Sequence, residues 1–248
     1  MLFLALGAAV TVHAQDQEES SQEEPCQENS CQETAASNGG AGFFSIGVQF
    51  ADLAALNNRL SSKGYPTFSS EMVSIGGGGY TVLNRFLIGG QGHGLITGEQ
   101  GYNGRDVSVG GGYGLFTLGY LFRPTSNLHV YPQVGLGGGG VRLEIGSRGD
   151  AENFDDVLND PNRSASVGRA SLLVSLGGGL EYQFGGPEEH GGLRLGLRAG
   201  YLVSALNSDW QINTTTLSGG PDATLQGPFI RLTIGGSGTG HEDDEEDE

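Results

Sequence analysis

The chain is poor in several residue types whose abundance defines common protein classes. Its 248 residues include only two cysteines, eight prolines and one tryptophan. Two cysteines are too few for a scaffold held together by disulfides. With so few prolines and no glycine at every third position, the 46 glycines do not indicate collagen. Beyond the N-terminus no apolar run approaches the length of a membrane-spanning helix.

Basic residues are also scarce, and the formal net charge is −17. The acidity is concentrated in two places: residues 15–40 hold seven acids and no base, and residues 242–248 are seven consecutive acids. The rest of the chain, with 15 acids and 12 bases, is close to neutral. The two acidic segments are therefore expected to be solvated, disordered tails. Because there is no basic patch, nucleic acid is not an expected partner.

The two ends of the chain define its predicted organisation. An apolar run at 2–10 is followed by Val12-His13-Ala14, which suits cleavage by a signal peptidase after Ala14. The alternative for this run is a buried N-terminal strand. In the tail that follows, Cys26 and Cys31 favour a short-loop disulfide over a metal clip, since no further cysteine or histidine lies nearby. The predicted parts are a signal peptide (1–14), an acidic N-terminal tail (15–40), a folded domain (41–236) and a Gly/Ser linker with an acidic tail (237–248).

Within the folded domain, apolar residues alternate with small or polar ones, which is typical of strands with one lipid-facing side. The pattern is clearest where Leu172, Leu176 and Leu180 alternate with Ser171, Ser175 and Glu181. We predict eight strands of this kind: Phe43–Ala51, Met72–Leu83, Phe86–Ile96, Asp106–Phe122, His129–Leu143, Ala170–Phe184, Leu193–Val203 and Pro228–Gly235.

Four of these strands contain a block of glycines, at 76–79, 110–112, 137–140 and 177–179. Glycine weakens a regular strand, so its repeated presence needs a physical reason. A narrow barrel supplies one, because glycines leave space in a crowded lumen and let strands bend.

The connections between the predicted strands alternate in length. Short turns lie at 84–85, 123–127 and 185–192, and longer loops at 52–71, 97–105, 146–169 and 204–227. Outer-membrane barrels have this arrangement, with long loops outside the cell and short turns in the periplasm. Because eight is an even number, both tails are predicted on the periplasmic side. The leucine spacing at 52–60 predicts a short helix at the barrel mouth.

Residues 43–235 resemble the small eight-stranded outer-membrane barrels of the OmpX-like and opacity-like group. The segment Gly227–Leu232 is similar to the C-terminal assembly signal of that group, although this chain continues beyond it into Gly-Ser-Gly and seven acids. The resemblance implies an all-β fold, an eight-stranded antiparallel up-and-down transmembrane β-barrel. It also implies a location in the cell outer membrane, in contact with outer-membrane lipid.

His93 is the one weak candidate for catalysis. Some barrels of this size are lipid-modifying enzymes that use a histidine with a serine and a carboxylate. Here the position two residues after His93 is Leu95, and no serine follows His93 on its strand. A lumen histidine held by polar neighbours is therefore the favoured interpretation. The acids of the 146–169 loop, Asp150, Glu152, Asp155, Asp156 and Asp160, do not have the spacing of a calcium loop. No catalytic residue, metal or cofactor is predicted.

A structural cluster of charges is predicted inside the barrel. If the turn between the sixth and seventh strands is centred near 188–189, Glu181 lies opposite Gly196. Arg194 and Arg198 are then its diagonal neighbours on the same face, and Arg231 also points inward.

The predicted function is non-enzymatic. We expect a monomer with a filled lumen, which serves envelope structure or meets an extracellular ligand or host-surface partner through its long loops. Three alternatives remain open: an enzyme acting on lipid A or phospholipid, a small narrow channel, and a soluble secreted glycine-rich β-protein.

Overall fold

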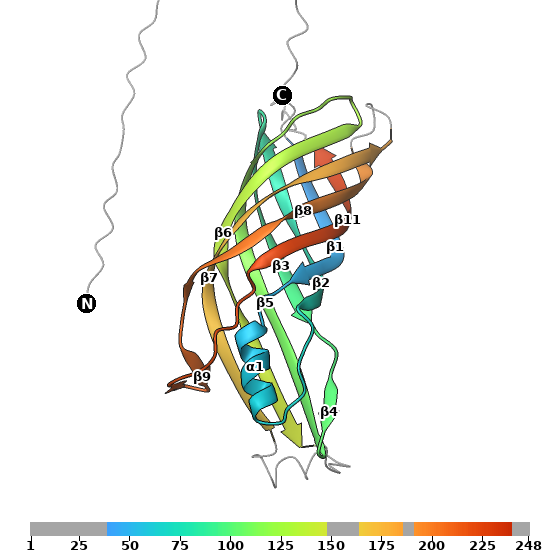
Figure 1. Cartoon of the computed structure of the whole chain (residues 1–248). Helices are drawn as coiled ribbons and strands as arrows, with labels where there is room; N and C mark the ends of the chain where they lie inside the picture. Colours follow the sequence, from blue (N-terminus) through green and yellow to red (C-terminus); the bar gives the residue numbers. More distant parts are fainter. Residues whose placement is uncertain (1–38, 148–163, 186–190, 240–248) are drawn as a thin grey trace, which may run out of the picture. The chain divides into compact units, whose positions relative to one another are not determined.

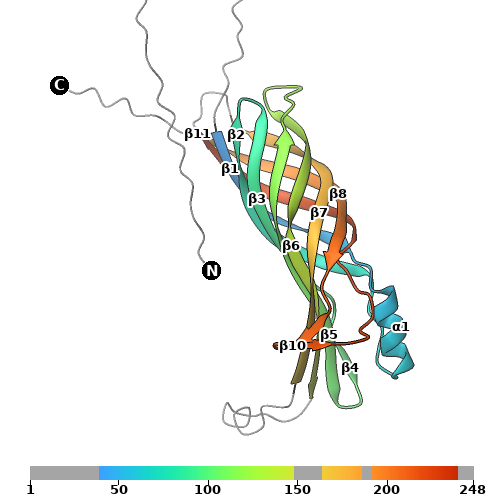
Figure 2. The same cartoon turned by 90° about the vertical axis from the view of Figure 1, so that its left-hand side faces the viewer.

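The computed structural model describes residues 39–147, 164–185 and 191–239. They form an antiparallel sheet that closes on itself into a barrel (Figures 1 and 2). The ring closes because β1 pairs with both β2 and β11, and β8 pairs with both β11 and β7. The wall consists of eight long strands: β1 (Gly39–Phe50), β2 (Glu71–Leu83), β3 (Phe86–Ile96), β5 (Arg105–Tyr120), β6 (Leu128–Ser147), β7 (Ser164–Phe184), β8 (Gly191–Asn207) and β11 (Gly227–Thr239).

This architecture confirms the predicted eight-stranded up-and-down barrel. The strand ends differ from the prediction in several places. β5 ends at Tyr120 instead of Phe122, and β8 continues from Val203 to Asn207. β1 includes two residues assigned to the N-terminal tail, and β11 includes three assigned to the linker. β6 and β7 extend beyond Leu143 and Ala170 into the segment expected to be a loop. Their pairing persists there through the backbone, as between Ile145 and Ala165, although the outward side chains are no longer apolar.

The alternation in the sequence produces a barrel with an apolar outside and a mixed inside. Outward residues such as Phe86 and Leu232 are 61 % and 63 % exposed, whereas inward neighbours such as Leu87 and Thr233 are buried. An exposed apolar face of this extent on every strand is the lipid-facing surface of a membrane barrel. Membrane lipid therefore provides the environment in which burying these side chains stabilises the fold.

Aromatic side chains gather on the outside at the end of the barrel where the short turns lie. Phe86, Tyr120 and Phe122 pack with ring centroids 5.5 and 5.0 Å apart, and Tyr182 lies 4.9 Å from Phe184. Aromatic rings concentrate where hydrocarbon meets head groups. This girdle therefore marks one membrane interface, and we call the two ends of the barrel the turn end and the loop end.

The strands are strongly staggered around the ring. Pairing partners traced from Gln49 of β1 through β11, β8, β7, β6, β5 and β3 to Val82 of β2 return to β1 at Gly39. The offset is ten residues (49 − 39), which tilts the strands against the barrel axis. An eight-stranded barrel of this kind has an interior that side chains fill.

The loop end contains a helix and additional strands. The helix α1 (Ala54–Ser62) confirms the predicted short helix, and it buries Leu56 and Leu60. β5, β6 and β7 continue past the other strands as an extension of the wall (Figure 2). Three short strands that the sequence analysis did not predict, β4 (Gln100–Tyr102), β9 (Trp210–Ile212) and β10 (Thr215–Leu217), broaden this extension.

An apolar cluster fills the barrel mouth beneath α1. It includes Leu53, Met72, Leu173, Leu202 and Leu225, each at most 1 % exposed. A smaller cluster around Val82, Leu87, Leu121 and Tyr131 lies toward the turn end. Charged lumen residues contact both apolar clusters: Glu181 bonds Tyr131 of the smaller cluster, and Arg231 bonds Tyr113 of the larger one.

Several predictions concern segments outside the described residues. These are the signal peptide, the N-terminal tail up to residue 38 with Cys26 and Cys31, the loop acids at 150–160, the turn at 186–190 and the C-terminal tail from residue 240. In the described part of the chain, no helix is long and apolar enough to cross a membrane.

Candidate functional site

Glu181 is the centre of one buried cluster in the lumen. Its side chain accepts hydrogen bonds from Arg198 (2.8 Å), Tyr80 (2.6 Å) and Tyr131 (2.5 Å). Arg194 lies 4.0 Å from the same carboxylate and donates to the Tyr80 hydroxyl at 2.8 Å. Glu181 is 3 % exposed, so the carboxylate is held by charge-assisted bonds away from bulk water. The Arg198 guanidinium also stacks on Phe43, 3.6 Å from the ring centroid.

Two glycines make room for this cluster. Gly196 is paired with Glu181, which is the predicted register. A Cβ at Gly196 would lie 2.6 Å from Glu181 Cγ and from Thr233 Oγ1, and one at Gly179 would overlap the Tyr131 ring. Inward glycines are therefore required by the width of the lumen.

Arg231 is the centre of a second cluster. It donates to Ser74 Oγ (3.2 Å), to Gln49 Oε1 (3.1 Å) and to the hydroxyl of Tyr113. Its guanidinium lies 4.1 Å from the Phe229 ring centroid and 3.3 Å from His93 Nε2. Arg231 is 2 % exposed. All of these hydrogen-bond acceptors are neutral, so among the described residues polar groups and an aromatic face stabilise this cation.

The environment of His93 constrains its tautomer. Nε2 lies 3.3 Å from an Arg231 nitrogen, which can only donate, and 3.5 Å from Gln91 Oε1, which can only accept. Because the contact with the cation is the shorter one, we assign Nε2 as acceptor and Nδ1 as the protonated nitrogen. Nδ1 lies 3.5 Å from Ser74 Oγ, and that hydroxyl already accepts a bond from Arg231. In the part of the chain that the structure describes, no carboxylate is recorded in contact with His93.

The predicted charge cluster is thus divided between two sites. Glu181, Arg198 and Arg194 lie together, whereas Arg231 belongs to the His93 cluster even though its backbone pairs with Arg198. Sequence reasoning missed Tyr80 and Tyr131, which supply two of the hydrogen bonds to Glu181. Their inward register was available from the alternation in β2 and β6, but the partners across the lumen depend on the stagger of the barrel.

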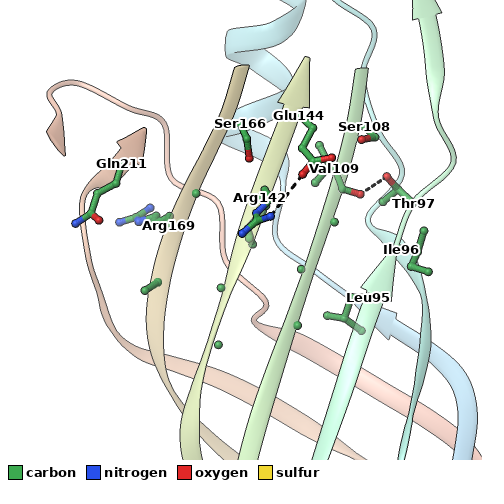
Figure 3. A pocket seen from close by; sticks show the side chains of 18 of the residues that line it. Leu95, Ile96, Thr97, Ser108, Val109, Arg142, Glu144, Ser166, Arg169 and Gln211 are labelled. Carbon is green, nitrogen blue, oxygen red and sulfur yellow. Dashed lines mark hydrogen bonds and ion pairs between the residues drawn. The ribbon is translucent and has the colours of Figure 1, made fainter. Parts of the chain in front are cut away.

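A groove of about 1060 Å³ lies on the wall at the loop end, over β5, β6 and β7 (Figure 3). Glycines form much of its floor, including Gly110, Gly112, Gly140 and Gly168. The end of β3, with the exposed side chain of Ile96, lies along one side. Gln211 of the β9–β10 hairpin lies on the other.

The polar side chains of the groove gather toward its loop end. Arg142 and Glu144 are consecutive outward residues of β6, with Arg142 Nη1 3.6 Å from Glu144 Oε1. Their side chains are 65 % and 53 % exposed, so each retains capacity to contact another group. Ser108 and Ser166, from the strands on either side, add hydroxyl groups (Figure 3).

No protein-family model matches the chain, and no curated protein matches its sequence. Solved structures do match. The attachment invasion locus protein Ail of Yersinia pestis is 14 % identical with a TM-score of 0.39, and Neisserial surface protein A is 12 % identical with a TM-score of 0.40. Each comparison covers 82 % of this chain and 97 % of the other. The outer-membrane protease OmpT of Escherichia coli is 10 % identical over 83 % of this chain and 98 % of its own, with a TM-score of 0.31.

The chain is an outer-membrane β-barrel. The closed ring of β1 to β11, the lipid-facing outer side chains and the aromatic girdle are the features of that class. The class includes proteins of different activity, so the fold does not determine the function. In the described ranges, no group of three or more histidine, cysteine, aspartate or glutamate residues is placed to hold a metal ion.

Proposed function

We propose that this protein is a non-enzymatic outer-membrane barrel that acts in envelope structure or surface interaction through its loop end. The observation that carries the proposal is the contrast between the two parts of the molecule. Large side chains fill the lumen, while α1, the β9–β10 hairpin and the extension of β5 to β7 form a structured surface beyond the membrane. The partner expected at this surface is an extracellular ligand or a molecule on another cell, and the barrel is expected to act as a monomer.

The filled lumen favours this function over a channel. Arg231, Tyr131, Met72 and Leu225 are each at most 2 % exposed, and they come from strands and loops on different sides of the ring. A steady path for ions would have to displace both a charged cluster and the apolar cluster under α1.

The state of His93 favours this function over hydrolysis. A general base must accept a proton from a nucleophilic hydroxyl. In the assigned tautomer, Nδ1, the nitrogen that faces Ser74, carries the proton, and Nε2 faces the Arg231 cation. The pair is also buried in the lumen, where a membrane lipid would have to enter to react.

Conductance in a planar bilayer tests the filled lumen. The purified, folded full chain should give no discrete current steps, and steady steps would favour the channel. The same preparation should release no fatty acid from phospholipid vesicles, and a release that His93→Ala abolishes would favour the enzyme.

Attachment tests the role of the loop end. Cells producing the full chain should bind a layer of host-type cells more than cells producing a variant in which the exposed loop-end residues Lys63, Thr216 and Ser218 are changed to alanine. The control changes Thr125 and Ser126 in a short turn. Equal attachment for all three would favour a role confined to envelope structure.

A further inference from the structure

Charge is divided unevenly between the two ends of the barrel. Among the described residues, the turn-end half holds Arg85, Arg123, Arg194 and Arg198 but only one carboxylate, Glu181. Glu181 is buried and already bonded to Arg198. At the loop end, carboxylates outnumber the cationic side chains. The described part of the turn end therefore carries an excess of positive charge.

Three of these arginines lie close together around the turn-end opening of the barrel. Arg85 lies in the β2–β3 turn, and its carbonyl accepts a hydrogen bond from the N–H of Leu121, two residues before Arg123. Arg123 lies in the β5–β6 turn. Burial and the nearby charges of Arg194 and Arg85 lower the pKa of its guanidinium. We call Arg85, Arg123 and Arg194 the turn-end rim.

The rim is suited to an anionic group. Arg194 is its inner member, since it donates to the Tyr80 hydroxyl at 2.8 Å and to Gln183 Oε1 at 2.9 Å. Its Nε makes no hydrogen bond with the described residues. Arg85 and Arg123 are exposed, and like charges placed this closely repel each other. Negative charge placed over the rim would therefore stabilise it.

The most acidic segment of the sequence begins within reach of this rim. β11 ends at Thr239, which pairs with Gly39, and Gly39 pairs in turn with Val82, three residues before Arg85. Neighbouring strands are about 4.8 Å apart, so Thr239 lies about 10 Å from Val82. The acidic run 242–248 begins three residues beyond Thr239, a distance that an extended chain covers in about 10 Å.

We propose that the acidic run 242–248 binds across the turn-end rim of the same molecule. The short connection to β11 gives the run a high effective concentration at the rim. Single exposed ion pairs are weak, so binding depends on many carboxylates acting together. The run has seven acids in seven residues, whereas the N-terminal acidic segment 15–40 has seven in twenty-six. The bound run would cover the turn-end opening, and this inference does not depend on the partner proposed at the loop end.

Paramagnetic relaxation measured by NMR tests the proposal. Both native cysteines are changed to serine, and a nitroxide is attached to the folded full chain in lipid nanodiscs through Glu246→Cys. At low salt the amide signals of Asn84 and Thr125, next to the rim, should lose most of their intensity. The signal of Asn103, at the loop end, should keep its own. Salt at about 1 M should restore the turn-end signals, because the Debye length falls to about 3 Å.

Variants of the rim and of the acidic run give independent readings. Arg85→Gln combined with Arg123→Gln removes two exposed cations and should lower the ratio of bound to unbound run about tenfold. The matched control, Arg105→Gln combined with Arg142→Gln, removes two exposed loop-end arginines and should leave the ratio unchanged. Changing the remaining acids of 242–248 to their amides leaves the barrel untouched and should abolish the relaxation.

The same signals distinguish the other possible occupants of the rim. No relaxation from Glu246→Cys would leave the rim to the acids of the adjacent turn, Glu188 and Glu189, and would overturn the proposal. Relaxation from a nitroxide on Cys31 alone would assign the rim to the N-terminal acidic segment. Equal relaxation in an isotope-labelled second copy mixed with the nitroxide-bearing chain would show binding between molecules, which also contradicts the proposal.

Discussion

At the scale of single residues, the lumen stabilises charge in two different ways. The Glu181 carboxylate is paired with Arg198 and accepts hydrogen bonds from two tyrosine hydroxyls. The Arg231 guanidinium instead donates to neutral acceptors and lies over the face of Phe229. Breaking either arrangement leaves a buried group without its partners. The cost of such a loss is far larger than the cost of losing an exposed pair.

Glu181→Ala should strongly destabilise the barrel, because it leaves the Arg198 cation and two tyrosine hydroxyls unpaired. The expected loss is about 3–5 kcal/mol in the free energy of unfolding. The control is Glu144→Ala, whose exposed pair with Arg142 contributes roughly 0–1 kcal/mol. Thermal or denaturant unfolding in detergent measures both, and equal midpoints for the two variants would show that the Glu181 cluster is wet and dispensable.

Two glycine substitutions separate the lumen from the outer wall. Gly196→Ala puts a Cβ 2.6 Å from Glu181 Cγ, so overpacking should cost about 1–3 kcal/mol. Gly114→Ala meets open space and should be neutral or raise stability by about 0.5–1 kcal/mol, because alanine suits a strand better than glycine. Unfolding in detergent again gives the comparison. A loss in Gly114→Ala as large as in Gly196→Ala would contradict the assignment of the inward glycines to packing.

At the scale of elements, α1 is attached to the barrel mouth by one amide side chain as well as by its leucines. Asn57 donates to the carbonyl of Phe68 at 2.8 Å and accepts from the Phe68 N–H at 2.9 Å. These bonds join the helix to the segment that leads into β2. Arg59 adds a bond to the Gly219 carbonyl in the last loop, at 2.9 Å.

Asn57→Ala should loosen the connection between α1 and β2 without unfolding the barrel. Two lost hydrogen bonds weaken local stability by about 1–2 kcal/mol, which corresponds to roughly tenfold faster amide exchange at Phe68. Hydrogen exchange resolved by NMR or mass spectrometry measures this. Asn58→Ala changes the neighbouring exposed residue and serves as the control. The attribution to Asn57 fails if the two variants exchange alike.

The elements differ in how well the sequence predicted them. Alternation over about ten residues located all eight wall strands, because every second side chain of such a strand faces lipid. Leucine spacing located α1, because one face of the helix is buried against the barrel. β4, β9 and β10 have three residues each, which is too short for a period to appear. A turn signal was nevertheless present for β4: Asn103 and Gly104 both have positive φ, as a two-residue hairpin requires.

The extension of β5 to β7 was missed for a different reason. Beyond Val141 the outward residues of β6 are Arg142 and Glu144, so the apolar alternation ends although the hydrogen-bonded pairing does not. The outer groove results from this extension of the wall and from the glycines of β5, β6 and β7 that line it. The sequence shows these glycines but does not reveal which face of the sheet they lie on. The sequence could place Glu181 between Arg194 and Arg198, but contacts across the lumen depend on the stagger.

At the scale of the whole molecule, orientation is the property most directly open to test. A cysteine at Ser218, in the loop-end hairpin region, should react with a membrane-impermeant maleimide on intact cells, whereas one at Ser126, in a short turn, should react only after lysis. Cys26 and Cys31 are first changed to serine, so that only the new thiol is labelled. Labelling of Ser126→Cys alone on intact cells would mean that the barrel is inverted.

The pairing of β1 with β11 also sets an order of events during biogenesis. β1 begins at Gly39 and β11 ends at Thr239, so the strand synthesised first must wait for the strand synthesised last before the ring can close. Until then β1 and β8, the two strands that β11 joins, are free edges, which readily pair with other chains. A polypeptide cut short before β11 would retain two open edges and no sealed wall. Folding therefore depends on keeping the nascent sheet from aggregating until its final thirteen-residue strand arrives.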